Sequence, residues 1–235
     1  MLPLLYVVRM DVEPDYLDTF VAWYDTRHAP DLIAAGFHSC SAYHCVVGGP
    51  FICNVYEIPS VELLGSDAYV AVRQADRQLV DEVLHKIADH SNTTYTQEAV
   101  VGVPAEALRP DDRPSRAGAV SAPVVATLRL DVEPDAEADL RRWYEEAEAA
   151  AQRRRPGFLR GRLARQHGKH PLFPSSQPDW LVLTEWATLD EALADGGGDE
   201  VCGRVADALG DRVSRLDYTV GRLSATLLSA TTWTV

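Results

Sequence analysis

The feature that most restricts the fold of this 235-residue chain is an internal repeat of its own sequence. Residues 9–15 (RMDVEPD) return as residues 129–135 (RLDVEPD), and the Trp-Tyr pair that follows them returns at the same spacing. Later matches keep this order: Glu57-Ile-Pro-Ser with Glu185-Trp-Ala-Thr, and Tyr95-Thr96 with Tyr218-Thr219. Because chance would not keep several matches in one order, the sequence predicts two copies of one structural unit.

A stretch without hydrophobic periodicity separates the two copies. Residues 104–123 are rich in Pro, Arg, Asp and Ala, and their spacing is typical of neither a helix nor a strand. We therefore expect a first unit over residues 1–103, a linker over 104–123 and a second unit over 124–235.

The pattern within the first copy predicts the element order βαββαβ. Leu4–Met10 is a short β-branched run, and Glu13-Pro14-Asp15 opens a helix with proline at a position where its missing N–H costs nothing. Residues 37–47 and 51–58 form a hairpin centred on Gly49, and a helix over 66–89 and a strand over 93–101 follow. This order is that of a split ferredoxin-like unit with a four-stranded antiparallel sheet.

The uncovered face of such a sheet predicts how the two copies pack. Helices cover one face of each sheet and leave the other face apolar, and burying that face against a second sheet is favourable. We therefore expect an α+β fold in which two fused ferredoxin-like βαββαβ units pack into one pseudo-dimeric α/β barrel.

Charge and hydropathy exclude two classes of partner. The chain has 22 Lys and Arg against 35 Asp and Glu, a net charge of −13, which repels nucleic-acid phosphates and anionic lipids. No apolar stretch approaches the roughly 20 residues that span a bilayer. We therefore predict no nucleic acid and no membrane as partner.

The cysteines and the N-terminal sequence predict a cytoplasmic protein. Residues 1–8 are apolar but lack a basic leader and a cleavage site, which favours a first strand over a signal peptide. Cys40, Cys45, Cys53 and Cys202 form no CxxC pair, so reduced thiols are expected. Cys45 and Cys53 are expected to face each other across the hairpin, and whether they are linked stays open.

The first predicted helix carries a motif that resembles a known family. Residues 20–30 (FVAWYDTRHAP), followed by Gly36-Phe37 at a strand start, resemble the first helix of EthD-like members of the dimeric α/β-barrel superfamily. The resemblance implies two units packed sheet against sheet, either in a homodimer or, for a fused tandem, in a monomer with an intramolecular pseudo-dimer. The superfamily includes cofactor-free monooxygenases, polyketide cyclases, lactone isomerases, dehydratases and haem enzymes, so the resemblance implies the fold more closely than the reaction.

Comparing the two copies predicts which half carries a site. His38, Cys40, Ala42 and His44 share one strand face and align with Leu159, Gly161, Leu163 and Arg165. Asn54 and Tyr56 align with Val182 and Thr184, and a hairpin centred on Gly49 places His44 opposite Asn54 and Ala42 opposite Tyr56. This polar face predicts a lined pocket in the first copy, because buried polar groups need partners. The alternative is that the two copies turn different faces to solvent.

His28 is the leading catalytic candidate. Asp25 and Asp31 flank it at three residues on either side, and an imidazole beside a carboxylate suits general acid–base catalysis near neutrality. In the family that the helix resembles, the His of the Trp-Tyr-x-x-x-His-x-Pro pattern is a pocket residue, and His28 occupies that position. The alternative is a capping or surface histidine near Pro30, as its counterpart Glu148 is expected near the helix edge.

Other polar residues complete the predicted site. His38 or His44 would be a second acid or base, and five residues would bind substrate: Tyr24, Tyr43, Asn54, Tyr56 and Tyr95. For the tyrosines a packing role is the alternative.

No metal site and no cofactor are predicted. His38, Cys40 and His44 spread over about 7 to 20 Å at ~3.3 Å per residue, too far for one ion to hold all three. Haem, known in related barrels through an axial histidine, is the alternative, with His28 or His38 as its ligand.

The predicted function is a cofactor-independent small-molecule enzyme. The resemblance implies a cyclase, isomerase, dehydratase or monooxygenase that acts on an aromatic or polyketide-like substrate in specialised metabolism. The Ala- and Arg-rich composition favours a bacterial source. The alternatives are a non-catalytic ligand-binding or assembly module of the same fold, or a haem-binding barrel.

Overall fold

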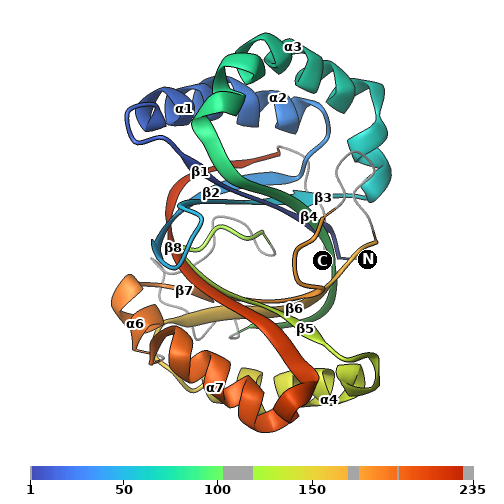
Figure 1. Cartoon of the computed structure of the whole chain (residues 1–235), viewed down its shortest axis with the longest axis vertical. Helices are drawn as coiled ribbons and strands as arrows, with labels where there is room; N and C mark the ends of the chain where they lie inside the picture. The colour runs from blue at the N-terminus through green and yellow to red at the C-terminus, as the bar shows by residue number, and fades with distance from the viewer. Residues whose placement is uncertain (1, 103–118, 169–174, 195, 230–235) are drawn as a thin grey trace.

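Eight antiparallel strands form one closed barrel in a computed structural model that describes residues 2–102, 119–168, 175–194 and 196–229 (Figure 1). The strand order around the barrel is β1-β3-β2-β8-β5-β7-β6-β4. The strands are β1 (Leu4–Val12), β2 (Ser39–Val47), β3 (Ile52–Ile58), β4 (Ile87–Gly102), β5 (Val124–Val132), β6 (Phe158–Gln166), β7 (Trp180–Trp186) and β8 (Val213–Leu228). The prediction of an α+β pseudo-dimeric barrel is confirmed.

Helices cover the outside of the barrel in two layers, one for each half of the chain (Figure 1). The first layer contains α1 (Leu17–Trp23), a π turn (Tyr24–His28), α2 (Ala29–Ala34), a 3-10 turn (Val61–Gly65) and α3 (Asp67–Val83). The second contains α4 (Glu137–Arg142), a π turn (Trp143–Glu148), α5 (Ala149–Gln152), α6 (Leu189–Leu193) and α7 (Gly197–Leu209). Among the described residues, no helix combines the length and the apolar character needed to cross a membrane.

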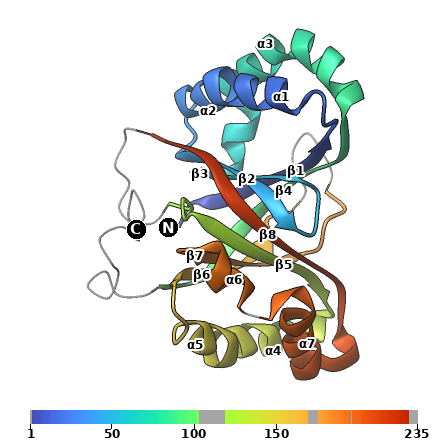
Figure 2. The ribbon, with the colours of Figure 1, turned by 90° about the vertical axis from the view of Figure 1, so that its left-hand side faces the viewer.

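Two long strands join the halves. β4 and β8 have 16 residues each, and each pairs with a strand of its own half and with one of the other half. β4 lies between β1 and β6, and β8 lies between β5 and β2, as Figure 2 shows for β8. Because this exchange closes the sheet, no strand of the barrel is left with an unpaired edge.

The register of these long strands corrects one part of the predicted repeat. β1 pairs Leu5 with Tyr95, whereas β5 pairs Val125 with Gly221. Leu5 and Val125 are equivalent in the repeat, so the counterpart of Tyr95 is Gly221, and the match of Tyr95 to Tyr218 was wrong. The two tyrosines point to opposite faces of the sheet, because they differ by an odd number of positions in the shared register.

The β2–β3 hairpin is centred on Gly48 instead of Gly49. Ala42 pairs with Asn54, so the expected pairing of His44 with Asn54 was wrong by two residues. Gly48 has φ of +67°, and a Cβ there would lie 2.4 Å from the Tyr218 carbonyl oxygen, so the turn needs glycine at this position. A shift of two residues keeps every side chain on its predicted face.

The same register shows that the expected pairing of Cys45 with Cys53 across the hairpin was wrong. Cys53 lies opposite Tyr43, and both thiols are free and buried in the barrel interior. Burial raises the pKa of Cys45, and it raises the pKa of Cys53 to about 12. Both groups therefore stay protonated thiols at neutral pH.

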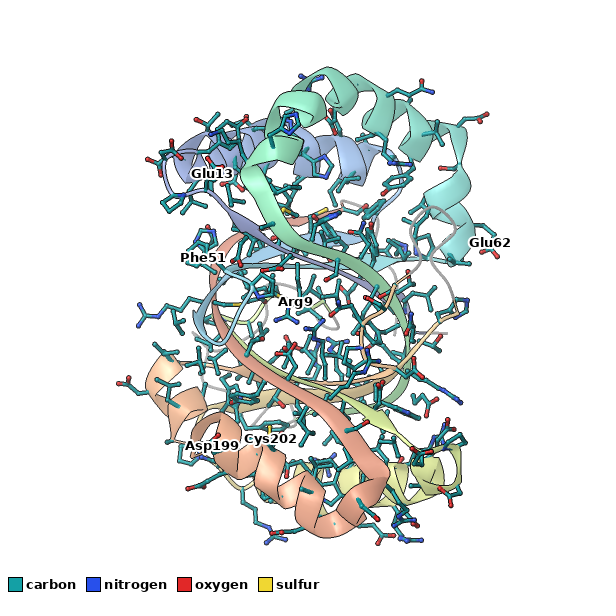
Figure 3. The ribbon with its side chains drawn as sticks, viewed as in Figure 1. Arg9, Glu13, Phe51, Glu62, Asp199 and Cys202 are labelled. Atoms are coloured by element: carbon teal, nitrogen blue, oxygen red, sulfur yellow. The ribbon has the colours of Figure 1, made fainter. Side chains whose placement is uncertain are left out.

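The barrel interior has an apolar middle and a charged cluster towards each end. Leu5, Val7, Val55, Leu181 and Leu183 belong to the apolar middle. Near one end, Arg9 and its repeat counterpart Arg129 both contact the carboxylate of Asp217. Figure 3 shows Arg9 between the two sheets. The repeated arginine therefore has a structural role in both halves.

The second charged cluster neutralises two repeated glutamates. Arg162 donates through Nε and Nη2 to Oε1 of Glu185 at 3.2 and 3.1 Å, and its Nη1 lies 3.8 Å from Oε1 of Glu57. Arg160 lies 3.8 Å from Glu185, and Ser39 donates to Glu57 at 2.7 Å. Both glutamates and Arg162 are buried, so each charge depends on its partners.

A segment that the sequence assigns to the linker lies inside the barrel. Residues 119–122 are buried, and the carbonyl of Val120 accepts a hydrogen bond from Ser41 at 2.6 Å. Tyr43 donates to the Ala122 carbonyl at 3.1 Å, and the Val120 N–H donates to Glu57 at 3.3 Å. The rest of the predicted linker, residues 103–118, lies outside the described residues.

Replacing Arg162 tests the second charged cluster. We expect Arg162→Met to lower the free energy of unfolding at pH 7 by about 3–5 kcal/mol, because two buried carboxylates lose their shared cation. Urea denaturation measures this loss. The control is Arg142→Met, because Arg142 pairs with Asp139 on the exposed surface and should change stability by less than about 1 kcal/mol. Equal effects of the two variants would contradict the assigned role.

The stability of Arg162→Met should depend on pH in a defined direction. Burial raises the pKa of Glu57, and Arg162 opposes that effect. A carboxyl group whose pKa is higher in the folded state destabilises the fold as pH rises above its unfolded value. The difference in the free energy of unfolding between the wild type and the variant should therefore become smaller as the pH is lowered from 7 towards 5. Urea titrations of both proteins at each pH measure the difference, and a constant deficit would contradict this reasoning.

Candidate functional site

A π turn interrupts the first helix of each half at the same place in the repeat. In the first half it runs from Tyr24 to His28, and in the second from Trp143 to Glu148. Such turns insert one residue into a helix and occur often at functional sites. The sequence analysis did not predict this feature.

His28 is held by a buried carboxylate on the neighbouring helix. Its Nδ1 lies 2.8 Å from Oδ2 of Asp76, a residue of α3. The Asp76 side chain is 3% exposed, and the His28 side chain is 21% exposed. An ionised carboxylate only accepts hydrogen bonds, so the neutral tautomer that fits this contact has its proton on Nδ1 and its basic lone pair on Nε2.

Aromatic rings fix the orientation of this imidazole. The ring of His28 stacks on Trp23 with centroids 4.6 Å apart and lies 5.7 Å from the ring of Tyr24. Its side chain makes no capping hydrogen bond at the start of α2, which argues against the capping alternative. The predicted flanking partners, Asp25 and Asp31, are not the carboxylate that His28 contacts.

The second half places a different ion pair at the equivalent position. Glu148 corresponds to His28, and Arg204 corresponds to Asp76 at the same displacement as Glu185 to Glu57. Arg204 donates to both oxygens of Glu148, at 2.8 and 2.9 Å. Glu148 is buried, so the expectation that it lies near the helix edge was wrong.

Three of the predicted substrate-binding residues, Tyr24, Tyr56 and Asn54, form a chain of contacts that begins at His28. Tyr24 lies next to His28, and its ring centroid is 6.4 Å from that of Tyr56. Asn54 donates through Nδ2 to the Tyr56 hydroxyl at 3.3 Å. Burial raises the pKa values of Tyr24 and Tyr56 well above their usual range, so both phenols stay protonated.

His38 and His44 do not converge on His28. His44 stacks on Phe51 at 4.8 Å near the hairpin, and His38 precedes the other end of β2. Burial lowers the pKa of both histidines, so their neutral form is favoured. In the part of the chain that the structure describes, no three His, Cys, Asp or Glu side chains form a group that could hold a metal ion.

Tyr43 and Tyr95 do not belong to the His28 cluster. Both point into the barrel interior, on the opposite face of the sheet from Tyr24 and Tyr56. The Tyr43 hydroxyl donates to the Ala122 carbonyl, and the Tyr95 hydroxyl donates to the Pro178 carbonyl at 3.3 Å. These hydrogen bonds attach the segments that contain Ala122 and Pro178 to the strands of the barrel.

Known structures share this fold. No family profile matches the sequence, and no curated protein matches it either. A crystal structure described as an anthrone oxidase-like protein matches with a TM-score of 0.66 at 13% identity, over 97% of this chain and 94% of that chain. A monooxygenase candidate from Fusobacterium nucleatum subsp. nucleatum gives 0.62 at 9% identity, over 97% and 94% of the two chains. A chlorite dismutase variant from Candidatus Nitrospira defluvii gives 0.51 at 9% identity, over 94% and 91%.

At such low identity these similarities show the fold alone. The architecture of this chain is therefore that of the dimeric α/β-barrel, ferredoxin-like proteins. Shared architecture of this kind hosts unrelated reactions, so the reaction has to be argued from the site.

Proposed function

We propose that this protein is a cofactor-independent small-molecule enzyme in which His28 is the general acid or base and Asp76 positions it. The observation that carries the proposal is the 2.8 Å contact between the partly exposed imidazole of His28 and the buried carboxylate of Asp76. The EthD-like pattern around His28 supports the same assignment.

The dyad suits abstraction of a proton from a substrate. Asp76 holds the Nδ1–H of His28, which leaves Nε2 to accept the proton. The negative charge of Asp76 then stabilises the imidazolium that forms, as an orienting carboxylate does beside a catalytic histidine. Return of the proton to another substrate atom would complete a cyclisation, isomerisation or dehydration, and reaction of the anion with dioxygen would complete an oxygenation.

The surroundings of His28 favour an aromatic substrate. Trp23 stacks on the imidazole and its ring is partly exposed, and aromatic groups stack well on such a surface. The fold match to an anthrone oxidase-like protein supports an aromatic ketone of the anthrone type. Asn54 and Tyr56 hold Tyr24 from the sheet side, while His38 and His44 take no part in this proton step.

The alternative is a ligand-binding module without catalysis. Such a module would bind its ligand on the same face of the first half. It would differ from an enzyme in one measurable respect: the ligand would bind without being converted. Mutating the dyad separates the two.

Replacing His28 tests the proposed base. Anthrone is a suitable probe, because its oxidation by one dioxygen yields anthraquinone and one water. The rate of this reaction is measured as oxygen consumption. We expect His28→Ala to lower kcat at least about 100-fold, the usual effect of losing a general base. The matched control is His85→Ala, which removes an exposed histidine and should leave turnover unchanged.

The outcomes of this experiment are distinct. Unchanged turnover by folded His28→Ala protein would overturn the assignment of the base. Binding of anthrone by the wild type without any oxygen uptake would favour the ligand-binding module.

Replacing Asp76 by asparagine tests the positioning role. Asp76→Asn keeps a hydrogen-bond acceptor but removes the charge that stabilises the imidazolium. We therefore expect the acid limb of the pH–rate profile to move to lower pH, with a smaller loss of kcat than in His28→Ala. A profile that keeps the wild-type position would show that Asp76 has only a structural role.

A further inference from the structure

The second half contains a hollow at the place that tyrosine rings fill in the first half. Tyr6 pairs with Tyr56 across β1 and β3, and at the equivalent positions Ala126 pairs with Thr184 across β5 and β7. The two tyrosine rings lie 5.6 Å apart and belong to the packed core of the first half. Alanine and threonine fill less of that volume in the second half, and both residues line a hollow there.

Three polar residues that line the hollow, Glu148, Gln152 and Thr184, are linked by hydrogen bonds. Gln152 donates through Nε2 to Oε1 of Glu148 at 2.7 Å, and the hydroxyl of Thr184 donates to Oε1 of Gln152 at 3.2 Å. Arg204 occupies both oxygens of Glu148. The carboxylate is thus neutralised and turned towards its own partners, so the hollow does not demand a charged ligand.

One residue that lines the hollow, Trp186, has a donor without an acceptor. Trp186 is 1% exposed, and its Nε1–H makes no hydrogen bond. A buried donor without a partner is costly, and most are satisfied by another group or by a bound molecule. The first half has Ile58 at this position, so the unmatched donor is particular to the hollow.

The other walls are apolar and aromatic. Trp143 and Tyr218 line the hollow and are both partly exposed, so they form its outer side. Burial raises the pKa of Tyr218 to about 12, and its hydroxyl is therefore neutral at pH 7. With its solvent-open mouth the hollow measures about 290 Å³. Its enclosed part admits about one water molecule, so a larger ligand requires the two outer rings to move aside.

We propose that this hollow is a second ligand site, separate from the His28 dyad, which binds a neutral aromatic molecule through one acceptor oxygen. The aromatic body lies among Trp143, Tyr218 and the apolar floor, and its oxygen accepts the hydrogen bond of Trp186. An aromatic ketone has this combination of one acceptor and no donor. The site binds without reaction, and the proposal is independent of any role of His28.

Binding of 1-tetralone and tetralin tests the proposal. Both probes have the same ring system, but only 1-tetralone has a carbonyl oxygen. Calorimetric titration of the wild-type protein should show 1-tetralone binding roughly three- to tenfold more tightly than tetralin, the contribution of one hydrogen bond. Trp186→Phe keeps the aromatic wall and removes the N–H, so it should abolish this difference.

Filling the hollow provides the second test. Ala126→Tyr and Thr184→Tyr each introduce the ring that the first half has at the same position, and each should reduce 1-tetralone affinity at least about tenfold. The matched control is Ala138→Tyr, which adds the same ring at an exposed position in α4 and should leave affinity unchanged. His28→Ala should also bind 1-tetralone normally, which separates this site from the proposed catalytic one.

Three results would overturn the proposal. They are absence of 1-tetralone binding to the wild type, full binding by a folded filled variant, and an unchanged preference for 1-tetralone in Trp186→Phe. The first would show that the hollow holds water only. Thermal unfolding checks that each filled variant folds, and if neither does, the Trp186→Phe comparison decides alone.

Discussion

The closure of one barrel by two shared strands is the constraint on which the rest of this structure depends. β4 and β8 each pair with both halves, so the inner faces of the two sheets cannot separate without breaking strand pairing. The middle of those faces is therefore buried, including the repeated Glu57 and Glu185. Arg162 resolves the conflict between burial and charge for both of them at once. The helix layers outside the barrel are then free to differ, and both proposed sites lie on that side of the sheets.

The internal repeat was sufficient to predict the architecture but not the strand register. A repeat fixes which residues are equivalent, whereas register depends on turns and bulges that a single sequence specifies weakly. The hairpin therefore shifted from Gly49 to Gly48, and Tyr95 proved equivalent to Gly221. Alternation along β2 already separated Tyr43 from the face that carries His38 and His44. Strict use of that period would have kept Tyr43 out of the predicted site.

The candidate site was predicted only in part, because its decisive contact is distant in sequence. His28 was identified from its motif, but its partner Asp76 lies on another helix, and the nearby carboxylates were the wrong ones. A signal for the true partner was present: where His28 becomes Glu148, Asp76 becomes Arg204, and the two changes together keep a charge-matched pair. The hollow was missed because the sequence analysis took polar side chains in the first half as the sign of a pocket. Space in a packed protein depends on side-chain size, and the small residues are in the second half.

The fusion of the two units has a consequence for how their chemistry can diverge. In a homodimer any substitution occurs in both subunits, so a pair such as His28 and Asp76 would be present twice, and so would any hollow beside it. In this chain each position is encoded once, so a substitution in one helix layer leaves the other layer unchanged. One half can keep a titratable dyad while the other exchanges tyrosines for alanine and threonine, and the shared strands hold both in register.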